Sequence, residues 1–327
     1  MSDLKQRLLD MVRDDLQKIE SSLEFHLITN FDLVSKVASH LLFSGGKRLR
    51  PLLLILSARI CGLNGRVALD LATAFEYLHT ATLLHDDLVD GASIRRGKPV
   101  ANSLWDNSTA VLVGDFLFAR ASSIAADTRN IEAIKVLAGV TEEMSQGEIF
   151  QLTKKGNTHL TEEEYLEVIR RKTAVLFQGA CRIGASVADA EEDHKSALTN
   201  YGFNLGIAFQ MADDLLDYLQ EDLSTLGKKA GADLREGKVT LPVIHTLNKA
   251  TEKDRVRIRA IIRNGDFSID EFKLLVDLMK QYGGLTYTRE KALAYVQTAK
   301  ASLSVFPDSR TRDILMGFAD YALARNA

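Results

Sequence analysis

The chain has 327 residues, enough for one large hydrophobic core or two small ones. It is 46% apolar and 26% charged, as is typical of a globular protein, and its net charge of −3 argues against a nucleic-acid partner. The charged N-terminus lacks the apolar segment of a signal peptide, no uninterrupted apolar run approaches the length of a membrane span, and only two cysteines occur. We therefore expect a cytoplasmic protein without stable membrane insertion.

Apolar residues recur at helical spacing along the whole chain, and no alternating pattern longer than four residues indicates a strand. This pattern predicts helices over 3–24, 30–43, 51–63, 66–90, 103–126, 130–153, 161–187, 194–220, 240–249, 253–264, 268–282, 284–304 and 309–325. The four prolines all fall at predicted helix starts or in loops. We expect one all-α domain over residues 1–327, a helical bundle around a deep cavity that opens at one end.

Two aspartate clusters interrupt otherwise apolar helical segments. They are Asp86–Asp90 (DDLVD) and Asp213–Asp217 (DDLLD). Three carboxylates within five residues repel one another, and near a core they persist only if cations or protons neutralise them. The first and last aspartate of each cluster are four residues apart and share a helix face. Two such faces turned toward each other would hold several Mg²⁺ ions and a diphosphate, because Mg²⁺ binds through carboxylates, waters and phosphates.

Two basic segments accompany these clusters. Gly45–Pro51 (GGKRLRP) combines a tight turn, three cations and a helix start, which favours an anion cradle that contains Lys47 and Arg50. Arg95 and Arg96 follow the first aspartate cluster directly, and paired arginines can each bind a phosphate in bidentate fashion. The alternative interpretations are a solvated basic turn for the first segment and a salt-bridge network for the second.

Further polar residues share faces with these motifs. His79 lies seven residues before Asp86 on the same predicted helix face, although a lone histidine on an apolar helix is more often a core residue. Glu148 and Gln151 are three residues apart and lie either near the site or on the surface.

The second half of the chain supplies another set of candidates. Lys172 and Thr173 offer a charge and a hydroxyl beside an apolar helix, where the alternative is a lysine with a buried stem at a helix edge. Gln210, three residues before the second cluster, is predicted to lie on its metal-binding face. Lys228 and Lys238 belong to a glycine-punctuated loop that could close over a metal-bound diphosphate.

Together these motifs resemble the trans-isoprenyl diphosphate synthases, or polyprenyl synthetases, from about residue 30 to the C-terminus. Within that family the chain is most similar to the long-chain bacterial enzymes of the octaprenyl diphosphate synthase type, which make quinone side chains. The resemblance implies the all-α isoprenoid synthase fold, two or three Mg²⁺ ions as cofactor, isopentenyl and allylic diphosphates as substrates, and usually a homodimer. The allylic primer would be farnesyl or geranylgeranyl diphosphate.

The resemblance also assigns roles. It implies that isopentenyl diphosphate is bound by Lys47, Arg50, His79 and Arg96. The allylic diphosphate would be bound by Arg95, Lys172, Thr173, Gln210, Lys228 and Lys238. Magnesium would be bound by Asp86, Asp90 and Asp213, supported by Asp87, Asp214 and Asp217. All six aspartates, together with Lys172 and Lys228, would be the catalytic groups.

Product length is predicted to depend on the helix that carries the first cluster. Ala81 and Thr82 lie five and four residues before Asp86, and Leu78 and Phe75 follow further along the face. Short-chain members of the family carry an aromatic residue at this gate, which is roughly 7.5 Å from the aspartates at 1.5 Å per residue. Ala81 leaves the gate open, which favours a long product. A short- or medium-chain farnesyl or geranylgeranyl diphosphate synthase is the alternative.

Two other functions compete with this interpretation. A terpene cyclase or head-to-head synthase also uses aspartate-rich helices but needs no second diphosphate site such as GGKRLRP. A non-catalytic subunit of a heteromeric prenyltransferase typically loses aspartates or basic loops, and this chain keeps both. A nucleotide-binding role is disfavoured because neither GxGxxG nor a P-loop follows a strand.

Overall fold

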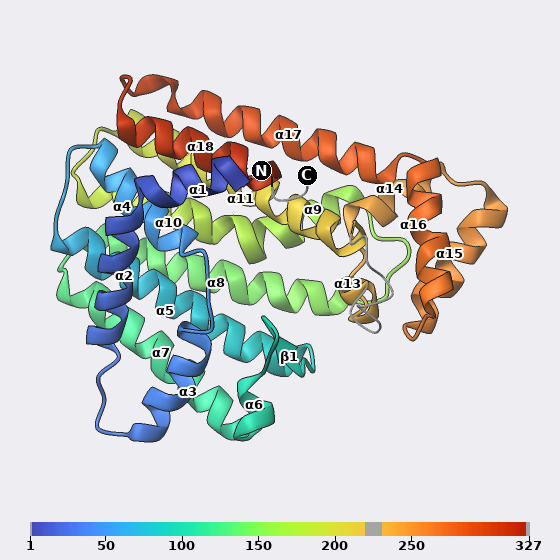
Figure 1. Cartoon of the computed structure of the whole chain (residues 1–327), viewed down its shortest axis with the longest axis horizontal. Coiled ribbons are helices and arrows are strands. Elements are labelled where there is room, and N and C mark those ends of the chain that lie inside the picture. The colour runs from blue at the N-terminus through green and yellow to red at the C-terminus, as the bar shows by residue number, and fades with distance from the viewer. Residues whose placement is uncertain (1, 220–230, 325–327) are drawn as a thin grey trace.

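The computed structural model describes residues 2–219 and 231–324, and helices account for most of them (Figure 1). The helices are α1 (Ser2–Met11), α2 (Arg13–His26), α3 (Asp32–Leu42), α4 (Leu49–Ile60), α5 (Arg66–Val89), α6 (Ala101–Leu104), α7 (Asn107–Asp127), α8 (Ile131–Lys154), α9 (Glu162–Ile169), α10 (Val175–Val187), α11 (Glu192–Tyr218), α13 (Ala232–Arg235), α14 (Leu241–Lys249), α15 (Glu252–Asn264), α16 (Ile269–Gln281), α17 (Gly284–Ser302) and α18 (Arg310–Ala324). The only strands among these residues, β1 (Ile94–Arg95) and β2 (Lys98–Pro99), form an antiparallel hairpin.

The all-α prediction is confirmed, with three local corrections. The helix predicted over 3–24 is two helices, because Val12 leaves the helical conformation between α1 and α2. The helix predicted over 103–126 begins as α6 and restarts as α7, where the Asp106 carboxylate caps the new helix by accepting the Thr109 N–H. The helix predicted over 161–187 contains a π-helical turn at Arg170–Ala174 between α9 and α10.

The predicted capping box at the start of α9 is present. Thr161 accepts a hydrogen bond from the Glu164 N–H, and the Glu164 side chain accepts one from the Thr161 N–H. A second capping box, formed by Ser268 and Glu271, begins α16. These side chains satisfy N–H groups that have no partner within the helix, which fixes where each helix begins.

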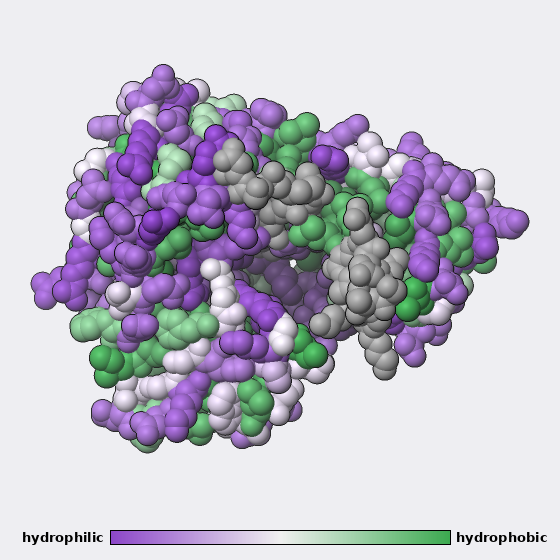
Figure 2. Space-filling view, viewed as in Figure 1, coloured by the Kyte–Doolittle hydropathy of each residue, from purple (hydrophilic) through white to green (hydrophobic). Residues whose placement is uncertain are grey.

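Helix α10 lies at the centre of the bundle and packs against α4, α5, α8 and α11. It thereby separates α5 and α11, the two helices that carry the aspartate clusters, and these helices end near the same hollow. Figure 2 shows this hollow near the middle of one face, with hydrophilic side chains at its floor. The arrangement matches the predicted helical bundle, although the hollow lies near the middle of this face rather than at one end.

Two clusters of buried apolar side chains form the core. The first joins α1–α8 to α10, α18, the N-terminal part of α11 and the C-terminal part of α17, and the second joins α9 and α13–α16 to the C-terminal part of α11 and the N-terminal part of α17. Tyr201 belongs to the first and Met211 to the second, so α11 contributes to both. This continuity favours one domain, although the single-domain assignment stays a prediction.

One helix within residues 2–219 and 231–324, α7, is long and apolar enough to cross a membrane by length and composition alone. It includes Asp115 and Arg120 and packs along α5, as the core helix of a bundle does. Such a single helix is weak grounds for a membrane span, and the cytoplasmic location stays a prediction.

Close packing of α10 on α4 requires Gly184. A Cβ atom at this position would lie 2.3 Å from the Leu54 carbonyl oxygen and 2.7 Å from the Ser57 Cβ. We predict that Gly184→Ala lowers the free energy of unfolding by about 3 kcal/mol, because backbone atoms have to move to admit the methyl group. Gly139→Ala is the matched control: Gly139 is also helical but meets no atom within 4 Å, so its replacement should stabilise by about 1 kcal/mol. Denaturant unfolding of both variants tests this, and equal stabilities would contradict the packing argument.

Candidate active site

The first aspartate cluster ends helix α5, and each of its carboxylates faces a cation. Asp86 lies 4.0 Å from the Lys172 ammonium, Asp87 accepts a 2.7 Å hydrogen bond from Arg95 Nε, and Asp90 accepts one of 2.8 Å from Lys238 Nζ. Asp87 is buried, whereas Asp86 and Asp90 are partly exposed. The structure thus brings three of the predicted diphosphate-binding cations onto this one cluster.

The pKa values of Asp86 and Asp90 are shifted in opposite directions. Burial, aided by the Asp90 and Glu148 charges, raises the pKa of Asp86 to about 6 even though Lys172 opposes the shift. Burial also opposes ionisation of Asp90, but Lys238 outweighs it and holds the pKa of Asp90 below its usual value. An additional positive charge would therefore favour the ionised form of Asp86 more than that of Asp90.

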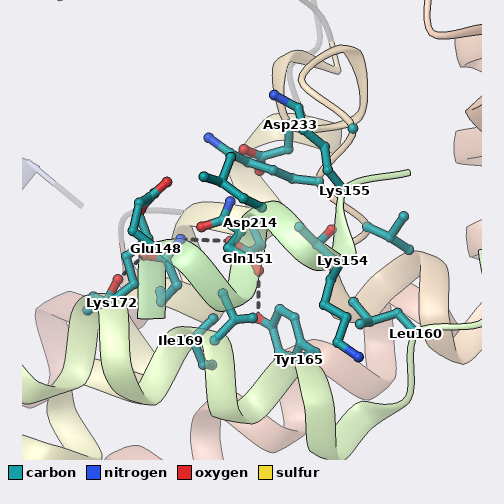
Figure 3. Close-up of a pocket in the computed structure, with 18 of the residues that line it drawn as sticks. Glu148, Gln151, Lys154, Lys155, Leu160, Tyr165, Ile169, Lys172, Asp214 and Asp233 are labelled. Atoms are coloured by element: carbon teal, nitrogen blue, oxygen red, sulfur yellow. Dashed lines mark hydrogen bonds and ion pairs between the residues drawn. The ribbon is translucent and has the colours of Figure 1, made fainter. Parts of the chain in front are cut away.

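The second cluster is held by a buried hydrogen-bond network. Tyr165 donates to Asp214 Oδ2 at 2.6 Å, and Gln210 Nε2 donates to Asp214 Oδ1 at 2.8 Å. Thr173 in turn donates to Gln210 Oε1 at 2.7 Å. Figure 3 shows Tyr165 of α9 pointing toward Asp214. Burial, with the charges of Asp213 and Asp217, raises the pKa of Asp214 to about 7 despite these two donors.

Asp213 and Asp217 extend the acidic surface to either side. Asp213 lines the hollow beside Arg50, and Asp217 accepts the backbone N–H groups of Ala232 and Asp233 at 3.0 and 3.1 Å. Gln210 was predicted to lie on the face of Asp213, and its hydrogen bond goes to Asp214, one turn along the helix. The Gln210 amide therefore holds the buried Asp214 carboxylate in place.

The π-helical turn at Arg170–Ala174 places Lys172 and Thr173. One extra residue in the turn shifts the helix face, so that Lys172 reaches both Asp86 and Glu148 while Thr173 faces Gln210. Lys172 Nζ lies 2.5 Å from Glu148 Oε2. The structure thus assigns Glu148 to the site, one of the two alternatives left open by the sequence.

Carboxylates of both clusters line one small cavity of about 130 Å³, which contains Asp90 and Asp214 together with Lys172 and Lys238. Figure 3 shows Lys172 and Asp214 at this cavity. Lys238 also contacts Glu236 at 2.6 Å, so one ammonium joins the end of α5 to the segment that follows α13. Lys228 lies outside the described residues.

A second cavity of about 710 Å³ adjoins the GGKRLRP turn. It is lined by the predicted isopentenyl diphosphate ligands Lys47, Arg50, His79 and Arg96, together with Arg95 and Asp213. Leu83 and Phe209 supply an apolar part of its wall. Asp213 and Asp214 are consecutive residues of α11, and each lines a different cavity, so the two cavities meet at the second aspartate cluster.

Arg48, the middle cation of GGKRLRP, faces the core instead. Its guanidinium donates to Glu76 at 2.6 Å, to Glu20 at 2.7 and 3.1 Å, and to the Leu42 carbonyl at 2.5 Å. Its backbone is in the left-handed conformation at φ 49°. The buried Arg48 thus anchors the turn and leaves Lys47 and Arg50 on the cavity side.

Arg50 and His79 form a pair in the cavity wall. Arg50 Nη1 lies 3.1 Å from His79 Nε2, and because guanidinium can only donate, this hydrogen bond assigns the imidazole proton to Nδ1. Burial, with the charges of Arg50 and Arg96, holds the pKa of His79 well below its usual value. Burial also lowers the pKa of Arg50 to about 10. His79 is therefore a neutral group that orients Arg50 and leaves the positive charge of the pair on the guanidinium.

The acidic side chains suit Mg²⁺ in their chemistry. Within residues 2–219 and 231–324, no three Asp, Glu, His or Cys side chains form a preformed metal cage. Mg²⁺ does not require one, because it commonly binds through one or two carboxylates plus waters and substrate phosphates. The raised pKa values of Asp86 and Asp214 fit a bound cation, because burial makes ionisation of both carboxylates costly and a cation would offset that cost.

The predicted chain-length residues lie in the core of α5. Phe75, Leu78 and Ala81 are each at most 2% exposed, and Thr82 is half-buried. None of the four lines either of the two cavities. They precede the aspartates along α5 and are packed by neighbouring side chains, so their role as a gate stays a prediction.

Sequence reasoning missed three contributors to the site. Tyr165 is buried against Asp214, Glu76 pairs with Arg48, and Asp233 lies beside the second cluster with its pKa raised by burial and by Asp214. The apolar periodicity of α9 marks Tyr165 only as a core residue. Only Glu76 could have been found from the sequence. An acidic residue inside a strongly apolar helical segment needs a partner of opposite charge.

Comparisons with known proteins agree with this architecture. A family model for polyprenyl synthetase matches residues 31–279. Octaprenyl diphosphate synthase of Escherichia coli is 35% identical over 98% of this chain and 99% of its own length, and geranylgeranyl diphosphate synthase of Methanosarcina mazei is 34% identical over 97% and 98%. A decaprenyl diphosphate synthase structure from Rhodobacter capsulatus superposes with a TM-score of 0.92 at 40% identity, covering 98% of this chain and 99% of its own. A structure of polyprenyl synthase from Caulobacter crescentus, complexed with calcium and isoprenyl diphosphate, superposes with a TM-score of 0.92 at 38% identity and covers 98% of both chains.

The helical bundle and its paired acidic helices define an isoprenoid synthase fold. The chain belongs to the polyprenyl synthetase family and is a prenyl diphosphate synthase by family.

Proposed function

We propose that this chain condenses an allylic diphosphate, farnesyl or geranylgeranyl diphosphate, with successive isopentenyl diphosphates to give a long all-trans polyprenyl diphosphate of octaprenyl-like length for quinone side chains. One observation carries this proposal: a small cavity that contains carboxylates of both aspartate clusters adjoins a separate basic cavity at GGKRLRP. A coupling of two diphosphates needs two such anion sites. A terpene cyclase, which uses one diphosphate, needs only the first.

The chain's own residues divide the work between the two cavities. Lys172 and Lys238 at the smaller cavity, with Arg95 beside Asp87, supply fixed positive charge where the leaving diphosphate develops charge. Lys47 and Arg50 hold the second substrate alongside, so its double bond meets the allylic carbon without a search in solution. Leu83 and Phe209 provide apolar surface between them that excludes water from a carbocation.

Magnesium is proposed as the cofactor, with two or three ions held by Asp86, Asp90 and Asp213. When bound, these ions supply Lewis-acid stabilisation of the leaving diphosphate. The lysines that pair with Asp86 and Asp90 lie within reach of that same diphosphate. We propose that these ammonium groups exchange carboxylate contacts for phosphate contacts when substrate binds.

Product length is the finer part of the proposal. Relatives of this chain include both octaprenyl and geranylgeranyl diphosphate synthases, so family membership alone does not choose between them. The small Ala81 before the first cluster supports the long product, because this position carries no aromatic ring of its own. A geranylgeranyl diphosphate synthase remains the second candidate.

Incorporation of radiolabelled isopentenyl diphosphate by the purified chain tests the activity. We expect Mg²⁺-dependent elongation of farnesyl diphosphate, with dephosphorylated products near octaprenol on chromatography. Cyclised or head-to-head products would contradict the proposal. Elongation that appears only after a second protein is added would identify the chain as a subunit of a heteromeric enzyme.

We also propose a homodimer, through large apolar side chains exposed on α7 and α8. Leu112 of α7 is 66% exposed, and Ile131 and Ile149 of α8 are each 63% exposed, on helices that pack against each other. We predict that Leu112→Glu converts a dimer to a monomer, since a charge buried in an apolar interface is costly. Light scattering after gel filtration measures this. The control Leu293→Glu, exposed on α17, should leave the mass unchanged, and a monomeric parent chain would refute the dimer.

A further inference from the structure

The cavity beside GGKRLRP has a wall that none of the motifs supplies. Lys5, Leu8, Leu9 and Val12 at its edge come from α1 and the residue that follows it, while Phe318 and Tyr321 come from α18. The family model spans residues 31–279, so both α1 and α18 lie outside the stretch that it matches. In Figure 1 α1 and α18 lie next to each other above α11.

The two terminal helices are packed tightly enough to act as one wall. Leu8 of α1 lies against Gly317 of α18, where a Cβ atom would meet Leu8 Cδ2 at 2.7 Å. Leu8 is 5% exposed and Phe318 is 6% exposed, and both belong to the larger apolar cluster. Burial of these side chains keeps the termini at the cavity.

The wall also contacts a predicted ligand directly. The Lys47 ammonium lies 5.4 Å from the centre of the Tyr321 ring and 5.8 Å from the centre of the Phe209 ring. Both distances are within the range of cation–π attraction. Lys47 is itself exposed on a glycine-rich turn, so the two rings restrict where its charge can lie.

Lys5 adds charge to the same cavity. It is an exposed side chain of α1, and it lines the cavity together with Lys47, Arg50, Arg95 and Arg96. Each further cation at such a site strengthens its attraction for a diphosphate, provided that the cation is not already neutralised within the protein. An ammonium from the N-terminal helix would close the side of the cavity that GGKRLRP leaves open.

We propose that α1 and α18 complete the isopentenyl diphosphate site: the Tyr321 ring positions the Lys47 ammonium, and Lys5 supplies an additional cation for the diphosphate. Tyr321 is thus a positioning residue and Lys5 a binding residue. This inference rests on the proposed prenyl-coupling function and deepens it, because it assigns the second substrate site to elements outside the recognised motifs.

Steady-state kinetics with each substrate varied separately test the inference. We expect Tyr321→Leu and Lys5→Glu each to raise KM for isopentenyl diphosphate by about threefold to tenfold, with little change in KM for the allylic diphosphate. Tyr321→Phe keeps the ring and should retain most of the low KM. The control Lys18→Glu, an exposed lysine of α2 that lines a different surface groove, should leave both KM values unchanged.

Two results would overturn the inference while the proposed function stands. One is an unchanged KM for isopentenyl diphosphate in both Tyr321→Leu and Lys5→Glu, in a parent chain that elongates normally. The other is an equal loss with both substrates together with a lower Tm, which would mean that the helices only support the fold. A parent chain that incorporates no isopentenyl diphosphate would instead refute the proposed function, and this inference with it.

Discussion

Replacing Asp86 or Asp213 by alanine is expected to reduce kcat for prenyl coupling by about 100-fold to 1000-fold, the range seen when one electrostatic group of an active site is removed. Asp86 faces Lys172, and Asp213 lies beside Arg50 at the other cavity. Either change removes a carboxylate that faces a cation and, with it, a proposed metal ligand. Initial rates of isopentenyl diphosphate incorporation, measured over a series of Mg²⁺ concentrations, give the effect.

Two comparisons separate chemistry from folding in this experiment. Asp277→Ala, at an exposed position of α16, should retain parental kcat and Tm. The double variant of Asp86 and Asp213 should be little slower than the worse single variant, because residues that act on one group are not additive. Parental rates in both single variants would contradict a role of the two aspartate clusters in the reaction.

Ala81→Phe is expected to shorten the products while the first condensations continue. Ala81 is 2% exposed and lies below the first aspartate cluster on α5, so a phenyl ring there would obstruct an isoprenoid tail that runs along the helix. Chain-length analysis of the dephosphorylated products measures the shift. The ring also overpacks the core at a cost of about 1–3 kcal/mol, so Tm has to be recorded alongside.

Ala72→Phe is the matched control for this change. Ala72 is buried in the same helix nine residues earlier, which places it on the opposite face, about 180° away at 100° per residue. It should lose comparable stability and keep the parental product length. If both variants give the parental length, the ruler interpretation of α5 is wrong, and if both shorten it, destabilisation rather than steric blockage is the cause.

Local regularities made most of the fold predictable. Apolar spacing placed the long helices, and Thr161 with Glu164 marked the start of α9. The π-helical turn was missed because apolar residues recur at helical spacing on both sides of it. The five-residue step from Ile169 to Ala174, both buried, was the available signal, since an α-helix would repeat at three or four.

The site was predictable as a set of residue types and less so as a set of contacts. The aspartate spacing identified the carboxylates that line the hollow, but which cation meets which carboxylate depends on segments far apart in sequence. Lys238 contacts Asp90 across 148 positions, and Arg48 is buried by Glu20 and Glu76, each 28 positions away. No local pattern distinguishes the buried Arg48 from Lys47 beside it, because tertiary packing determines which of the two side chains is buried.

The measurement closest to the central claim is a crystal structure of the chain with Mn²⁺ and an unreactive allylic diphosphate, in which anomalous scattering locates the ions. The account predicts two or three ions between Asp86, Asp90 and Asp213, bridged by one diphosphate, with Lys172 and Lys238 on its oxygens. Ions bound elsewhere, or a diphosphate held without any of these carboxylates nearby, would contradict it.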